Sequence, residues 1–106
     1  MSVSIGKNKV GNNLPLTLIA GPCVIESLEL AQEVAGTIAE ITTKLEIPFI
    51  YKSSFDKANR SSLSSYRGPG IDAGLKILES VRKSVDVPVL TDVHEDTPLD
   101  EIASIV

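Results

Sequence analysis

The sequence contains few of the residues that crosslink or stack within a protein. Its 106 residues include one cysteine, one histidine, two tyrosines, two phenylalanines and no tryptophan. A single cysteine excludes an intrachain disulfide, so the sequence gives no indication of a secreted, disulfide-stabilised domain. Because aromatic residues are scarce, we expect a core built from Ile, Leu, Val and Ala.

Long apolar runs and an excess of basic residues are also missing. No stretch approaches the roughly 18 apolar residues that a membrane span needs, and residues 1–13 lack the apolar centre of a signal peptide. The net charge is −4, whereas nucleic-acid binding favours a basic surface. We therefore expect a cytoplasmic protein with neither a membrane nor a nucleic acid as its partner.

Short apolar runs alternate with helical patterns along the chain. Residues 1–13 carry a weak hairpin signal, although a disordered tail fits them equally well. Length and flanking Pro or Gly residues predict buried strands at 16–20, 49–51 and 87–91. Helices are predicted from 28 to about 45, from 71 to 84, and from 98 onward.

The helices have recognisable ends and apolar faces. Ser27 is the expected N-cap of the first helix, and Thr97, followed by Pro98 at the first helical position, is the expected N-cap of the third. Apolar residues spaced by three or four predict the buried faces. These faces are Leu30, Val34, Ile38, Ile41 and Leu45 in the first helix, and Ile71, Leu75 (or Gly74), Leu78 and Val81 in the second.

This order of strands and helices predicts an α/β fold with a parallel sheet, in either a barrel or an open arrangement. The third helix is cut short at the end of the sequence. We therefore expect residues 1–106 to be the N-terminal portion of a larger α/β protein.

Polar residues follow each predicted strand, and in parallel α/β folds this edge of the sheet binds ligands. Residues 51–70 hold four of the ten Lys and Arg residues together with six serines. Lys52 and Lys57 could bind one multiply charged anion, or be a solvated pair. Asn59, Arg60 and Ser61 could bind phosphate, or form a turn.

The clusters after the first and third strands contain the remaining reactive side chains. Cys23 could be a small buried hydrophobe or a thiolate ligand to a divalent metal. His94, two residues after Asp92, could carry protons, ligate a metal or donate a neutral hydrogen bond. A histidine that only bonds a nearby carboxylate is an equal alternative.

Three motifs resemble the 3-deoxy-D-manno-octulosonate 8-phosphate synthases. They are IAGPCVIES at 19–27, YKSSFDKANRSSLSSYRGPG at 51–70 and LTDVHE at 90–95. The resemblance implies a (β/α)8 barrel, of which this chain holds an N-terminal hairpin (1–13) and the first three βα units (14–106). It also implies a cytoplasmic transferase, tetrameric at full length, that condenses phosphoenolpyruvate with D-arabinose 5-phosphate in the synthesis of the lipopolysaccharide sugar Kdo.

The resemblance assigns roles residue by residue. Lys52 and Lys57 hold phosphoenolpyruvate, Ser54 is a further substrate contact, and Asn59, Arg60 and Ser61 bind arabinose 5-phosphate. Asp92 and His94 line the sugar site and, with Lys57, are the expected catalytic residues. Cys23 is the expected ligand to a divalent metal such as zinc, iron or manganese, with the other ligands on later strands.

Length sets this chain apart from the synthases, because a (β/α)8 barrel takes roughly 250 residues. We expect the isolated chain neither to close a barrel nor to turn over substrate. One alternative is a truncated, non-catalytic fragment that binds phosphorylated ligands or its full-length relative. Another is the related 3-deoxy-arabino-heptulosonate 7-phosphate synthase, which the sequence of residues 58–61 disfavours.

Overall fold

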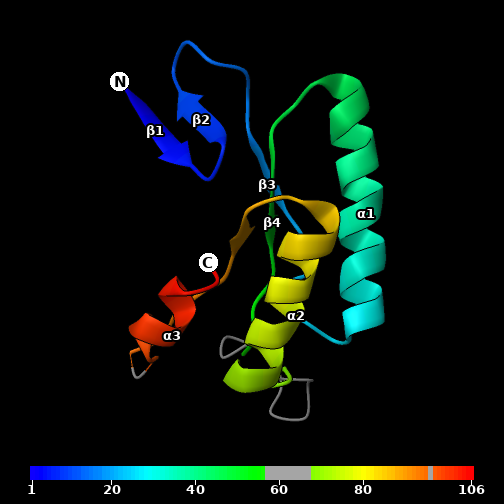
Figure 1. Cartoon of the computed structure of the whole chain (residues 1–106), viewed down its shortest axis with the longest axis vertical. Coiled ribbons are helices and arrows are strands. Elements are labelled where there is room, and N and C mark those ends of the chain that lie inside the picture. Colours follow the sequence, from blue (N-terminus) through cyan, green and yellow to red (C-terminus); the bar gives the residue numbers. More distant parts are fainter. Residues whose placement is uncertain (57–67, 96) are drawn as a thin grey trace.

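The chain forms an antiparallel hairpin and a three-stranded parallel sheet that carries two long helices on one face (Figure 1). The computed structural model describes residues 1–56, 68–95 and 97–106. The elements in order are β1 (Ser2–Ile5), β2 (Asn8–Gly11), β3 (Leu18–Ala20), α1 (Leu28–Leu45), β4 (Phe49–Lys52), α2 (Ile71–Val85), β5 (Val89–Leu90) and α3 (Leu99–Ala103). None of the described helices is both long and apolar enough to cross a membrane.

The predicted hairpin is confirmed. Strands β1 and β2 pair from Ser2 opposite Gly11 to Ile5 opposite Asn8, so Gly6 and Lys7 form a two-residue turn. The Lys7 ammonium lies 2.7 Å from the Asp86 carboxylate in the turn between α2 and β5. The hairpin therefore lies near the end of the sheet opposite the carboxyl ends of β3 and β4 (Figure 1).

The sheet is parallel, as predicted, with β4 at its centre. Its register pairs Ala20 of β3 with Tyr51 of β4, and Tyr51 with Val89 of β5. Side chains alternate between the two faces of a strand. Phe49 and Tyr51 join the core beneath α1 and α2, so Ile50 and Lys52 belong to the opposite face. Lys52, at the end of β4, is therefore on the face that the long helices leave uncovered.

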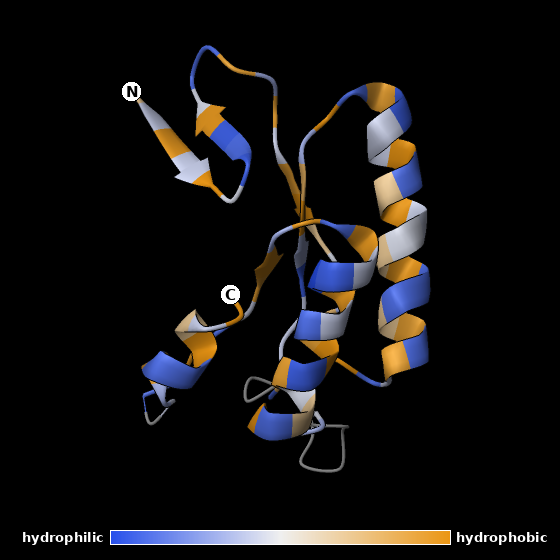
Figure 2. Cartoon of the chain, in the orientation of Figure 1, coloured by the Kyte–Doolittle hydropathy of each residue, from blue (hydrophilic) through white to orange (hydrophobic). Residues whose placement is uncertain are grey.

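The second predicted apolar face is confirmed, and the first is displaced. In α2 the buried residues are Gly74, Leu75, Leu78 and Val81, and Figure 2 shows hydrophobic residues recurring along the helix between hydrophilic ones. In α1 the buried residues are Ala31, Ala35 and Thr42, whereas Ile41 and Leu45 are exposed. Alanines allow a helix to approach its neighbours closely, so these small residues form the contact and the larger aliphatic residues lie at its border.

The other sequence predictions need smaller corrections. Ser27 caps α1 as predicted, because its hydroxyl accepts a hydrogen bond from the Leu30 N–H at 3.1 Å. β3 is shorter than predicted and its Leu18 and Ile19 are exposed, because this strand lies at the edge of the sheet and one face is uncovered. Pro98 stands at the N-cap of α3, and Thr97 accepts a hydrogen bond from the His94 N–H at 2.7 Å instead.

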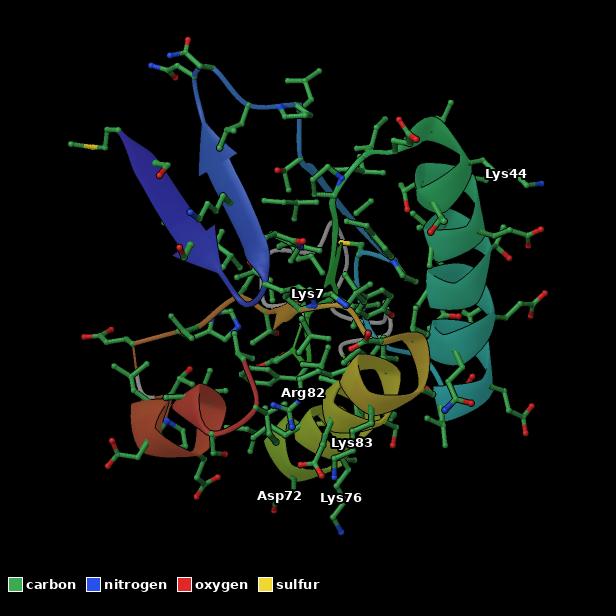
Figure 3. All side chains as sticks on the ribbon, turned by 45° about the horizontal axis from the view of Figure 1, so that its top comes forward. Lys7, Lys44, Asp72, Lys76, Arg82 and Lys83 are labelled. Carbon is green, nitrogen blue, oxygen red and sulfur yellow. The ribbon has the colours of Figure 1, made fainter. Side chains whose placement is uncertain are left out.

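Charged side chains on the long helices point to solvent. Lys44, Asp72 and Lys76 point away from the body of the molecule in Figure 3. Lys44 and Lys83 each lie near a glutamate four residues earlier on the same helix. Such exposed pairs contribute little to stability. The charged residues that could form a site are therefore found at the ends of the strands.

Candidate functional site

The residues that follow β4 bind both neighbouring strands beyond the ends of the regular sheet. The Ser53 N–H donates to the Leu90 carbonyl, and the Ser54 N–H donates to the Cys23 carbonyl at 3.1 Å. The Ser54 carbonyl in turn accepts from the Ile25 N–H at 2.9 Å, as part of a parallel bridge between Val24 and Ser54. These bonds hold the three segments after β3, β4 and β5 together.

The two serine side chains point to different neighbours. Ser53 is 1% exposed, and its hydroxyl donates to the Pro22 carbonyl at 2.6 Å. Ser54 is 4% exposed, and its hydroxyl donates to Asp92 Oδ2, also at 2.6 Å. The Ser53–Ser54 dipeptide is thus bonded on one side to the β3 segment and on the other to the β5 segment.

Lys52, Ser54 and Asp92 form the one predicted group that the described residues bring together. Lys52 Nζ lies 3.3 Å from Asp92 Oδ1, while Ser54 bonds the other carboxylate oxygen. The side chains of Lys52 and Asp92 are 38% and 49% exposed, so a solvent-borne anion can reach the ammonium. This group could offset the charge of an anionic ligand through Lys52.

The environment of Asp92 favours its ionised form. The hydrogen bond from Ser54 is the main reason that the pKa of Asp92 lies below its ordinary value, and the Lys52 ammonium lowers it further. Partial desolvation opposes these effects without outweighing them. Any contribution of this carboxylate to stability is therefore present above its ordinary pKa and is lost as the pH falls through the lowered one.

His94 lies in a different environment from Asp92. Its Nε2 is 3.0 Å from the Asp56 carbonyl, which can only accept, so Nε2 carries the proton of this bond. Its ring also makes an edge contact with Phe55, at 6.0 Å between centroids. With these residues it lines a cleft of about 210 Å³ beside Ile71 at the start of α2. The described contacts of His94 thus include a backbone carbonyl, and not the carboxylate partner considered from the sequence.

Cys23 lies at the same edge of the sheet, after β3, and is exposed. Its own carbonyl is held by Ser54 and that of Pro22 by Ser53, so its backbone is fixed from both sides. An exposed thiol at this edge is compatible with one metal–thiolate bond. Within residues 1–56, 68–95 and 97–106, no three His, Cys, Asp or Glu side chains cluster as a metal site.

The remaining predicted site residues, Lys57, Asn59, Arg60 and Ser61, lie outside the described residues. Two residues that determine the geometry of the site were not identified as site residues from the sequence. Ser53 anchors Pro22, and Gly21 lies so close to Lys52 that its position leaves no room for a side chain. The Gly-Pro pair after β3 and the paired serines after β4 were the available signals, because such residues allow close approach and bond backbone groups.

A parallel sheet with helices on one face defines an α/β protein, and the charged, hydrogen-bonded cluster at its carboxyl edge lies where such folds generally bind ligands. The sequence model of the DAHP synthetase I family matches residues 1–106. The chain belongs to this family, and together with the relatives described next this membership confirms the resemblance found in the motifs.

Curated relatives agree with this membership. The chain is 67% identical over 98 residues to a 2-dehydro-3-deoxyphosphooctonate aldolase of Alkalilimnicola ehrlichii. The aligned residues make up 92% of this chain and 35% of that protein. It is 60% identical over 106 residues to the protein of that name in Coxiella burnetii (strain Dugway 5J108-111), covering all of this chain and 38% of the relative. The chain thus spans little more than a third of the length of these relatives.

Proposed function

We propose that this chain forms the N-terminal third of a 3-deoxy-D-manno-octulosonate 8-phosphate synthase, in the first three units of a (β/α)8 barrel. The name of the relatives, 2-dehydro-3-deoxyphosphooctonate aldolase, designates the same enzyme. The observation that supports the proposal best is the Lys52, Ser54 and Asp92 cluster at the carboxyl edge of the parallel sheet. Cytoplasmic location and a homotetramer are further parts of the proposal.

In the proposed reaction, C3 of phosphoenolpyruvate attacks the aldehyde of D-arabinose 5-phosphate, water adds at C2, and cleavage of the C–O bond releases phosphate. Lys52 and Lys57 would offset the negative charge of phosphoenolpyruvate and orient it. Asn59, Arg60 and Ser61 would bind the sugar phosphate. Asp92 and His94 would line the sugar site, where they and Lys57 are the proposed catalytic groups.

A measurement of activity distinguishes the proposed synthase from the alternative, a non-catalytic fragment that only binds ligands. The test compares the 106-residue chain with a chimera in which it precedes the remaining part of the Alkalilimnicola ehrlichii relative. We expect phosphate release from phosphoenolpyruvate and arabinose 5-phosphate by the chimera and none by the chain alone, because a closed barrel needs roughly 250 residues. Turnover by the chain alone would contradict this expectation. A folded chimera without turnover would overturn the proposed function.

We also propose Cys23 as a ligand to a divalent metal, with the remaining ligands on later strands. Such a metal, when bound, would position the aldehyde or activate water. We expect a chelator to remove the activity of the unmodified chimera, and Cys23→Asn to lower the metal bound per chain because it replaces the thiolate. Metal analysis and activity measure the two effects, with the exposed Ser84→Ala as control. Full activity in chelator would show that Cys23 is not an essential ligand.

A further inference from the structure

The Ser54 side chain is buried at the edge of the site, where the resemblance predicts a substrate contact. Its hydroxyl is 2.6 Å from Asp92 Oδ2, and the residue is 4% exposed. A hydroxyl has one proton to donate, and this proton is used for the carboxylate. Because the residue is nearly buried, Ser54 has little surface with which to touch a ligand at this edge of the sheet.

Asp92 makes two separate contacts through its two carboxylate oxygens. Oδ2 accepts the Ser54 hydrogen bond, and Oδ1 lies 3.3 Å from Lys52 Nζ. Lys52 Nζ is 3.5 Å from Oδ2, so its closer contact is with the oxygen that Ser54 leaves available. The bond from Ser54 therefore fixes which way the carboxylate faces, and the carboxylate fixes where the ammonium lies.

We propose that Ser54 is a positioning residue, which orients Asp92 and through it the Lys52 ammonium toward an anionic substrate. This inference rests on the proposed function for the identity of the substrate. It assigns Ser54 a role through Asp92 in place of direct substrate contact. Because the contact with Asp92 already holds the Lys52 ammonium in place, the ammonium needs no reorientation when the anion binds, and this preorganisation favours binding.

The charged environment of Asp92 makes this role measurable. Among the described residues, the titratable groups whose charges act on Asp92 are Lys52 on β4, which contacts it, and His94 beyond β5, whose effect is smaller. Ser54→Ala leaves both groups in place and removes one neutral donor. We expect the pKa of Asp92 to rise towards its ordinary value, because a bond to the ionised form has been lost.

The adjacent serine provides a matched control. Ser53 is also buried and also donates its hydroxyl at 2.6 Å, but to the Pro22 carbonyl. Ser53→Ala therefore removes a similar hydrogen bond without touching Asp92, and we expect the Asp92 titration to stay unchanged. Ser54→Thr keeps the hydroxyl and should restore the titration of the unmodified protein.

The experiment has two parts. In the first part, ¹³C NMR of the 106-residue chain with ¹³C-labelled aspartates measures the chemical shift of the Asp92 carboxyl carbon as a function of pH. The Asp92 signal is assigned by its absence from the spectrum of the Asp92→Asn variant. In the chimera, Ser54→Ala should lower kcat/KM by about 10- to 100-fold, the effect of losing a hydrogen bond to a charged group. It should also move the acid limb of the pH profile to higher pH, which a purely structural defect would not do.

The outcomes are distinct. An Asp92 pKa that rises in Ser54→Ala and not in Ser53→Ala supports the proposal, even if the chimera fails as a synthase. Equal Asp92 titrations in the two alanine variants overturn it, whatever the activity. If the isolated chain does not fold, the pH profile of the chimera decides, and an acid limb that does not move in Ser54→Ala overturns the proposal.

Discussion

Replacing Lys52 by methionine is expected to lower kcat/KM for phosphoenolpyruvate by about 10- to 100-fold, because charge-assisted hydrogen bonds to an anion are lost. Methionine keeps an unbranched side chain of similar length and removes the ammonium, with its charge and its N–H donors. Lys52 ends β4, and its half-exposed ammonium lies 3.3 Å from Asp92 Oδ1. The measurement is steady-state phosphate release by the chimera, with the loss expected mainly in KM.

Lys44→Met is the matched control for this variant. Lys44 is exposed near the end of α1 and lies 3.7 Å from Glu40, a pair of the kind that contributes little. Its replacement should leave the kinetic constants unchanged. If Lys52→Met and Lys44→Met gave the same kcat/KM, Lys52 would not bind the anionic substrate, although a catalytic role of the other basic residues would stand.

Gly21→Ala is expected to lower the free energy of unfolding by about 3 kcal/mol, the upper end of the usual range for an overpacked site. A Cβ atom at Gly21 would overlap the Lys52 carbonyl oxygen and would lie 3.2 Å from a ring carbon of Tyr51. The oxygen belongs to the backbone of the central strand and cannot turn aside. Either β3 and β4 must separate or the strand must bend.

The measurement is denaturation by urea, and the control is Gly36→Ala. Gly36 lies in α1, where an added Cβ meets nothing within 4 Å. Alanine should stabilise this helix position by about 0.5–1 kcal/mol, because glycine loses more backbone freedom on folding. An equal effect of the two substitutions would show that the close approach at Gly21 carries no cost.

The order and type of the elements could be predicted because each follows from local chemistry. Pro48 limits α1, Ser27 begins it, and the spacing of Leu75, Leu78 and Val81 defines the buried side of α2. These signals lie within a few residues of the feature that they determine. The sequence left residues 1–13 open between a hairpin and a disordered tail. The structure has the hairpin, in which two short strands are joined by a turn at Gly6 and Lys7.

What could not be predicted depends on contacts between distant residues. The buried side of α1 is set by how closely its alanines approach the rest of the core. Hydrophobic spacing alone instead predicts that the larger aliphatic residues are the buried ones. At the site, Lys52 and Asp92 could be placed at the same edge, but not as a contact pair. One local prediction also failed: the Thr97 hydroxyl accepts a hydrogen bond from the N–H of His94, three residues earlier, and Pro98 stands at the N-cap of α3 instead.

The Ser53–Ser54 dipeptide has a mechanical consequence. One peptide unit joins the segment that presents Cys23 to the segment that presents Asp92, through side-chain bonds of 2.6 Å on each side and backbone bonds beside them. A force that displaces either segment is transmitted to the other over a few covalent bonds. The carboxyl edge should therefore respond to load as one stiff body, with less independent movement than separate surface loops would have.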